Sequence, residues 1–264
     1  MILVLVVLGA LLRFYRIDAQ SLWVDELLTL GAAEVGGNLG PAQFFGNIQG
    51  PIHALLVHAA AGFSESTFAL RSISALFGVA LIPLAYLLGR SMVDRATGLL
   101  TALFVTVSPF AIWYSQELRN YALLMLLSAG ATLLIVRIVL EKRRSWLPYV
   151  AVAGLSVYTN LSAAFLVAAH AFFALPRALR ERRFLRRAAL AFVAVALLAA
   201  PMLWGLSMWN ESQDITERAT FAPAADTSEL RRGSTTFSPV AVPYAAYSMA
   251  YGFSLGPGLR ELHG

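Results

Sequence analysis

Long apolar runs separated by short polar segments dominate the hydrophobic pattern of this chain. A helix needs roughly 17–25 mostly apolar residues to cross a bilayer, and several runs approach or reach that length. Two of them are short and meet at Thr159-Asn160, which predicts a tight turn between two helices. The first twelve residues are apolar but too few for a full span, so we expect the chain to begin within its first membrane helix. The clear runs cover residues 69–89, 98–114, 121–140, 146–160, 161–176 and 188–208.

Residues 51–62, "PIHALLVHAAAG", raise a question of topology, because a run of this length is more often interfacial or re-entrant than spanning. Cytoplasmic loops are enriched in Lys and Arg, which allows a test. If 51–62 lies on the surface and the N-terminus is cytoplasmic, then 90–97, 137–144 and 177–187 face the cytoplasm. These segments hold 12 of the 20 Lys and Arg residues and 3 of the 15 acids, which gives +9 inside and −4 outside. We therefore predict a long external loop over residues 13–68.

The composition agrees with an integral membrane protein. Hydrophobic residues make up 58% of the chain and charged residues 13%, with a mean hydropathy of +0.68, whereas soluble domains carry roughly 25% charged residues. The absence of cysteine excludes disulfides, thiolate metal sites and cysteine nucleophiles. Although the pI is near 9.8, the basic residues concentrate in the predicted cytoplasmic loops. We therefore predict contact with membrane lipids and no nucleic-acid partner.

The predicted fold is all-α, a polytopic transmembrane helix bundle of about seven membrane helices whose long first external loop bears interfacial helices. We assign residues 1–208 to this membrane domain. Residues 209–264 are rich in Pro, Gly, Ser and Thr, and we expect them to form an external loop that stops before further helices. The chain is thus expected to be the N-terminal part of a larger bundle.

Two adjacent acids, Asp25 and Glu26, interrupt the apolar stretch "SLWVDELLTL" at residues 21–30. One interpretation is an ordinary surface helix, in which Ser21 caps the N-terminus and the acids favour the first turn. The alternative is a helix lying in the membrane interface, with Trp23 at headgroup depth. A carboxylate held between that apolar layer and a wet cavity is suited to act as a general base.

A second polar cluster, "YSQELRNY" at residues 114–121, separates two predicted spans. One interpretation is a polar turn flanked by interfacial tyrosines. The other is part of a phosphate site, because the guanidinium fork of Arg119 matches phosphate oxygens. In the second interpretation, Glu117 orients Arg119 or joins Asp25 around a divalent cation.

Other ionisable residues fall on the same external side of the predicted topology, among them Glu65 and Arg71 at the mouth of the second span. Ionisable groups near a membrane are costly unless they are paired or hydrated, so clusters converging on one face favour a functional site. We interpret His53 and His58 as interfacial or packing residues, because a spacing of five does not place them on one helix face.

The stretches "LLRFYRIDAQSLWVDELLTL" and "YSQELRNY" resemble GT-C superfamily glycosyltransferases, specifically the prokaryotic relatives of dolichyl-phosphate-mannose protein mannosyltransferases. The resemblance covers roughly residues 1–208. It implies a multi-pass enzyme of a prokaryotic plasma or inner membrane that takes a sugar from a polyprenyl-phosphate carrier. The sugar is transferred with inversion to a protein, lipid or glycan acceptor on the external face. The resemblance implies no certain cofactor besides this lipid-linked donor substrate, and it leaves open whether a divalent metal binds.

Residue by residue, the acid of "WVDE", Asp25, is the implied general base, and Glu26 is implied to support it or to contact the sugar. The implied contacts to donor phosphate and substrate come from Arg71, Gln116, Glu117, Arg119 and Tyr121. One departure concerns "QGPIH" at residues 49–53, where relatives often carry a His-Pro-Pro-Leu-like segment.

Two other classes compete with an enzyme. A non-catalytic lipid-binding or assembly protein of the same fold would show the same apolar runs and polar clusters. A transporter is disfavoured, because its ionisable residues should lie near mid-membrane rather than at the ends of spans. The sequence contains no Gly-rich phosphate loop, so nothing in it supports a soluble nucleotide-sugar donor.

Overall fold

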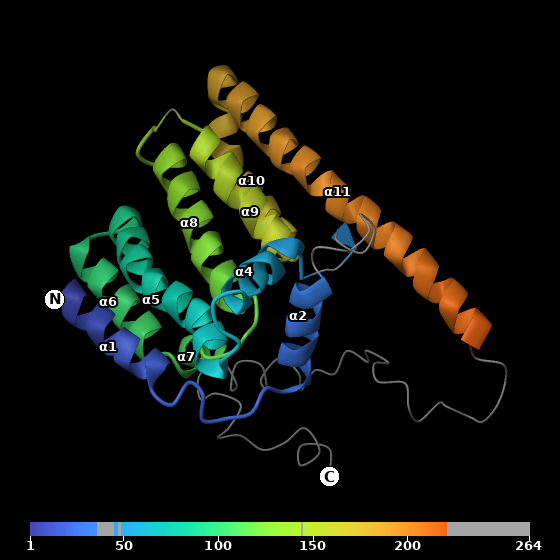
Figure 1. Ribbon diagram of the computed structural model, residues 1–264. Coiled ribbons are helices and arrows are strands. Elements are labelled where there is room, and N and C mark those ends of the chain that lie inside the picture. Colours follow the sequence, from blue (N-terminus) through green and yellow to red (C-terminus); the bar gives the residue numbers. More distant parts are fainter. Residues whose placement is uncertain (36–44, 47–48, 144, 221–264) are drawn as a thin grey trace, which may run out of the picture.

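The computed structural model describes residues 1–35, 45–46, 49–143 and 145–220, of which 34–35 and 209–220 are described as backbone only. The described residues form helices and no strands (Figure 1), which confirms the predicted all-α class. The helices are α1 (Ile2–Phe14), α2 (Val24–Val35), α4 (Pro51–Ala61), α5 (Thr67–Met92), α6 (Arg95–Val107), α7 (Pro109–Ser115), α8 (Tyr121–Val139), α9 (Leu147–Thr159), α10 (Ala163–Ala178) and α11 (Arg182–Thr220).

Three described helices are long and apolar enough to cross a membrane alone: α5, α8 and the part of α11 from Arg182 to Met208. Helices α6 and α7 qualify together as a fourth, bent span. Helices α1, α4, α9 and α10 are apolar but shorter. The 13 residues of α9 rise only about 20 Å, against a hydrocarbon core of roughly 30 Å. The membrane bundle is confirmed, whereas only three or four of the expected seven spans meet the length criterion.

A bend of 58° between α6 and α7 breaks the run predicted at 98–114. Pro109 begins α7, and because proline lacks a backbone N–H it cannot donate the hydrogen bond that would continue α6. Ser108 instead caps α7, its hydroxyl accepting from the Ala111 N–H at 3.3 Å. Helix α7 ends at Ser115, beside the candidate site, and residues 116–120 connect it to α8.

The bundle has two halves joined through α8. In the first, α5 packs against α1, α6, α7 and α8, and Gly78 permits a close approach because a β-carbon there would lie 2.0 Å from Ser115 Oγ. In the second, α8, α9, α10 and α11 enclose a buried cluster that includes Tyr149 and Val157. Helices α2 and α4 pack against each other at the end of the bundle opposite the α8–α9 and α10–α11 loops (Figure 1).

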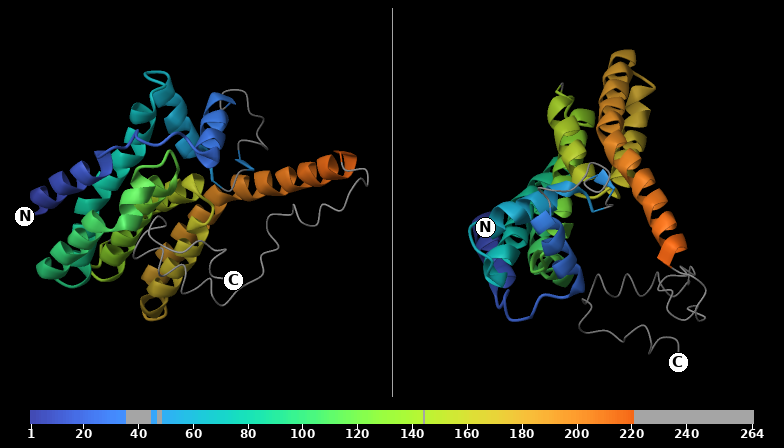
Figure 2. Two further views of the ribbon diagram at one scale, coloured as in Figure 1. Left: turned by 90° about the horizontal axis from the view of Figure 1, so that it is seen from below. Right: turned by 45° about the vertical axis from the view of Figure 1, so that its right-hand side comes forward.

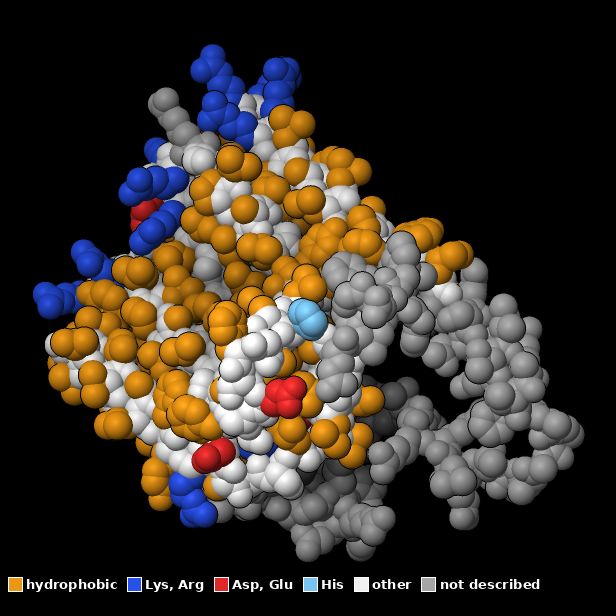
Figure 3. Space-filling view, in the orientation of Figure 1, with side chains coloured by type: hydrophobic (Ala, Val, Ile, Leu, Met, Phe, Trp, Pro, Cys, Tyr) orange, Lys and Arg blue, Asp and Glu red, His pale blue; other side chains and the backbone are white. Residues whose placement is uncertain are grey.

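Basic side chains gather mainly at one end of the face seen in Figure 3, beyond a broad hydrophobic band. The α8–α9 and α10–α11 loops lie at this end (Figure 1). This segregation is the one that the positive-inside rule requires of a membrane bundle. The assignment of this end to the cytoplasm stays a prediction.

Helix α11 continues past residue 208, where we expected an external loop to begin, and its last turns extend beyond the bundle (Figure 2). The rest of that predicted loop, residues 221–264, lies outside the described residues.

Candidate active site

The start of α2 decides which way its two acids point. The helix begins at Val24, so the predicted cap at Ser21 is wrong. The Trp23 carbonyl accepts from the N–H groups of Glu26 and Leu27, each at 3.0 Å, while the Glu26 carboxylate accepts the Trp23 N–H at 3.2 Å. An acid at the third helical position that reaches back in this way satisfies an otherwise unpaired amide. Glu26 is fully buried as a result, whereas the Asp25 side chain is 40% exposed.

Glu26 and Arg71 of α5 form a buried ion pair. Arg71 Nη2 lies 2.6 Å from Glu26 Oε2, and Nε donates to Oε1 at 2.8 Å. The remaining guanidinium hydrogens reach backbone carbonyls of the loop that precedes α2, those of Ile17, Gln20 and Ser21. Oε1 also accepts the Leu118 N–H at 2.7 Å. A single ion pair therefore holds together the first loop, α2, α5 and the segment that follows α7.

Buried charges are tolerated only when their hydrogen bonds are satisfied, and this pair meets that condition. Glu26 lines neither of the two cavities described below. Its position agrees with the expected supporting role, because it fixes the backbone on which Asp25 stands. Arg71 was expected near Glu65, but its partner is Glu26 on a different element.

Residues 116–120 are fixed by their own side chains. The Gln116 amide donates to the carbonyls of Leu12, Arg13 and Tyr15, which ties the segment to the end of α1. Asn120 Nδ2 donates to the Gln49 carbonyl at 2.9 Å and to the Thr159 carbonyl at 2.8 Å. Between them, Leu118 is fully buried. The segment is thus a rigid connection, although it lies in no helix.

Asp25 and Arg119 meet at the wall of a cavity of about 400 Å³, here termed the Asp25 cavity. Arg119 Nη2 lies 3.6 Å from Asp25 Oδ2, and Nη1 donates to the Asp25 carbonyl at 2.9 Å and to Thr29 Oγ1 at 3.3 Å. The guanidinium stacks over Tyr121, 5.5 Å from the ring centroid. The cavity is lined by Asp25, Leu28, Thr29, Ala32, Gln49, Gly50, His53, Ala54, Arg119 and Asn120.

Two buried nitrogens at this cavity have no hydrogen-bond partner among the described residues, Nε2 of His53 and Nε of Arg119. Burial, and then the charge of Arg119, lower the pKa of His53 to about 4. The imidazole is therefore neutral at neutral pH and can donate or accept one hydrogen bond. His58 is exposed, and its Nδ1 lies 2.8 Å from the Ala33 carbonyl, so its interpretation as an interfacial or packing residue stays a prediction.

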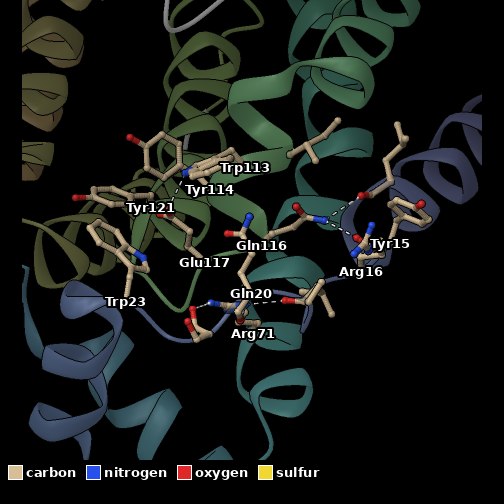
Figure 4. Close-up of a pocket in the computed structure, with 15 residues that line it drawn as sticks. Tyr15, Arg16, Gln20, Trp23, Arg71, Trp113, Tyr114, Gln116, Glu117 and Tyr121 are labelled. Carbon is tan, nitrogen blue, oxygen red and sulfur yellow. Dashed lines mark hydrogen bonds between the residues drawn. The ribbon is translucent and has the colours of Figure 1, made fainter. Parts of the chain in front are cut away.

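Glu117 lies at a second and larger cavity of about 860 Å³, here termed the aromatic cavity. Trp23, Trp113, Tyr114 and Tyr121 surround Glu117, and Gln116, Tyr15 and Arg16 lie farther along (Figure 4). Trp113 Nε1, four residues earlier, donates to Glu117 Oε1 at 2.6 Å. The pKa of Glu117 is raised to about 7, mainly by burial and to a smaller extent by the charge of Glu26, while the Trp113 hydrogen bond, Arg119 and Arg71 act in the opposite direction.

The structure thus divides the predicted site residues between two cavities. Asp25 and Arg119 line one, whereas Arg71, Gln116, Glu117 and Tyr121 line the other. Asp25 and Glu117, predicted as a metal pair, line different cavities. No group of three or more His, Asp or Glu side chains within the described ranges is placed to hold a metal ion, so a metal on this pair stays a prediction without added support.

The predicted site residues did not include several that line these cavities, among them Trp113, His53 and Thr29. Trp113 had a signal, since its spacing of four from Glu117 places both on one side of a helical turn. His53 and Thr29 carry no such signal, because each sits within an apolar helix pattern that predicts packing.

Comparison with known families agrees with this architecture. The sequence profile described as dolichyl-phosphate-mannose-protein mannosyltransferase matches residues 49–204. That range includes Arg71 and the whole 116–121 segment, whereas Asp25 and Glu26 lie before it. A comparison with curated proteins found no match. The matched range covers more than half of the 264 residues. The chain therefore belongs to the dolichyl-phosphate-mannose-protein mannosyltransferase family, integral membrane glycosyltransferases of the GT-C type whose name implies a lipid-linked sugar donor and a protein acceptor.

Proposed function

We propose that this protein transfers a sugar from a polyprenyl-phosphate carrier to an acceptor hydroxyl at the external face of the membrane, in the Asp25 cavity. The observation that carries the proposal is the pairing of a partly exposed carboxylate with a buried guanidinium at one cavity wall. Glycosyl transfer from a phosphate-linked donor needs both groups, a base for the acceptor and positive charge for the departing phosphate.

In this proposal Asp25 removes the proton from the acceptor hydroxyl, and the acceptor oxygen attacks the anomeric carbon of the donor sugar. The bond between that carbon and the phosphate oxygen breaks at the same time, and the electron pair leaves with the polyprenyl phosphate. Attack from the face opposite the phosphate inverts the anomeric configuration. Arg119 lies beside the departing phosphate and stabilises its developing charge.

Arg119 is suited to this role because its surroundings hold it in place. Its side chain is 4% exposed, and Nη1 is fixed by the Asp25 carbonyl and by Thr29. Nη2 donates to Tyr121 Oη at 3.5 Å, and Nε is buried with no partner among the described residues. A preorganised guanidinium of this kind loses little freedom when it binds a phosphate.

We expect the substitution Arg119→Lys to raise the KM for a lipid-phosphate sugar on the order of tenfold, because lysine keeps the charge but loses the planar fork. Inhibition by free polyprenyl phosphate should weaken by a similar factor, since donor and product place their phosphate at the same point. The measurement is transfer of radiolabelled sugar by the purified chain in lipid vesicles.

Arg143→Lys is the matched control, because the Arg143 side chain is 71% exposed and lines neither cavity. It should change neither quantity. If Arg119→Lys retained the wild-type donor KM and product inhibition, Arg119 would not be the phosphate-binding residue.

A further inference from the structure

The aromatic cavity is built unlike the Asp25 cavity. The aromatic side chains around Glu117 are Trp23 before α2, Trp113 and Tyr114 in α7, and Tyr121 at the start of α8 (Figure 4). The rings of Tyr114 and Tyr121 pack edge to face with centroids 4.7 Å apart, which fixes both. Trp23 is about half exposed and stands at the wall without being buried in a core. Several aromatic side chains are therefore held around one hollow.

Glu117 lines this cavity, and one of its two carboxyl oxygens is unsatisfied. The residue is 9% exposed; Oε1 accepts from Trp113, while Oε2 is buried and has no partner among the described residues. A buried carboxyl oxygen without a partner costs free energy that a ligand hydroxyl would recover. Because its pKa lies near 7, the carboxyl can donate or accept that hydrogen bond at neutral pH.

Two arginines line the cavity, and one of them, the exposed Arg16, lies at the end away from Trp23 and Tyr121 (Figure 4). The Arg71 guanidinium is already occupied by Glu26 and by backbone carbonyls, so it has little left to offer a phosphate. A phosphate or carboxylate would also meet Glu117. A metal cation lacks a second and third acid or histidine there. The class of ligand that suits the aromatic end of the cavity is uncharged and has flat apolar faces and hydroxyls.

We propose that the aromatic cavity is a second saccharide site, in which a neutral sugar ring stacks on the aromatic walls and hydrogen-bonds to Glu117. Its volume of about 860 Å³ falls within the roughly 300–1,000 Å³ of typical ligand cavities. The sugar is part of an acceptor glycan, an assignment that rests on the proposed function, which places the donor sugar and its phosphate in the Asp25 cavity. The proposal does not require that Asp25 is the catalytic base, and it is tested by binding without turnover.

The test is saturation-transfer NMR of methyl α-mannopyranoside with the full chain in phospholipid nanodiscs, which avoids detergents that carry sugar head groups. The wild type should bind the glycoside. Trp23→Leu and Glu117→Gln should each weaken the apparent affinity about tenfold or more. Trp23→Leu is the safer variant for folding, because Trp23 is half exposed. Asp25→Asn, in the other cavity, should bind like the wild type.

Three results would overturn the proposal: no binding by the wild type, equal binding by all four proteins, or binding that is lost in Asp25→Asn and kept in Trp23→Leu. A short-chain prenyl-phosphate mannose then tests the source of the sugar. Simultaneous binding with the methyl glycoside is expected of a site for an acceptor glycan, whereas competition would contradict that assignment and indicate the donor sugar. A failure of Asp25→Asn to reduce sugar transfer would contradict the proposed function and leave this binding result unaffected.

Discussion

The substitution Arg71→Met is expected to leave little folded protein, with a loss of roughly 3 to 5 kcal/mol in the free energy of unfolding. It leaves the fully buried carboxylate of Glu26 without its cationic partner. It also removes the hydrogen-bond donor for three backbone carbonyls of the first loop. Folded domains are stable by only about 5 to 15 kcal/mol, so a loss of this size is large. Size-exclusion chromatography and thermal unfolding of the detergent-solubilised protein measure it.

Arg143→Met is the matched control for this prediction. Arg143 also pairs with a glutamate, Glu141, at 3.6 Å, but its side chain is 71% exposed. Exposed ion pairs contribute about 0 to 1 kcal/mol. We therefore expect Arg143→Met to unfold at nearly the wild-type temperature. If the Arg71 variant unfolded no earlier than this control, the buried pair would not be what holds the first loop, α2 and α5 together.

The substitution Asp25→Asn is expected to lower kcat for sugar transfer by about 10²- to 10⁴-fold, because a positioned general base contributes a factor of that size. Folding should be preserved, since the side chain is 40% exposed and the hydrogen bonds of α2 use its backbone carbonyl. Asparagine has the same shape but cannot take the proton from the acceptor hydroxyl. The measurement is the initial rate at saturating lipid-linked donor.

Asp18→Asn makes the same chemical change in the same predicted external loop. Asp18 is exposed and lines neither cavity, so this control should retain the wild-type rate. Undiminished transfer by Asp25→Asn would remove Asp25 from the mechanism.

The sequence predicted the helical membrane class and the neighbourhood of the site, but it did not predict which way its residues face. Asp25 and Glu26 are adjacent, and each residue of a helix turns about 100° from the last, so the two point in different directions. Predicting those directions requires the correct start of the helix. One of the two interpretations placed the cap at Ser21, whereas the helix begins at Val24 and the Glu26 side chain accepts the Trp23 N–H.

The 116–121 segment shows a second limit of sequence reasoning. In the sequence it is one polar cluster, and we treated its residues as a single group around a phosphate. In the structure the segment lies between two cavities, with Glu117 and Tyr121 at one and Arg119 at the other. Its path depends on distant contacts, such as those of Asn120 with the Gln49 and Thr159 carbonyls, and no local pattern reveals such contacts.

The span boundaries show a related limit. Hydropathy identified the apolar helices and showed that the runs of α9 and α10 are short, but it did not show that the run at 98–114 is bent at Pro109 into α6 and α7. The break at Pro109 nevertheless had a sequence signal, since a serine followed by proline typically begins a new helix.

The most direct test of the central claim follows both the donor and the stereochemistry of transfer in one reaction. Vesicles containing the purified chain are supplied either with radiolabelled β-linked polyprenyl-phosphate mannose or with a nucleotide mannose, and the anomeric configuration of the product is determined by NMR. Product is expected only from the lipid-linked donor, with α configuration. Transfer from the nucleotide sugar, or a product that retains the β configuration, would contradict it.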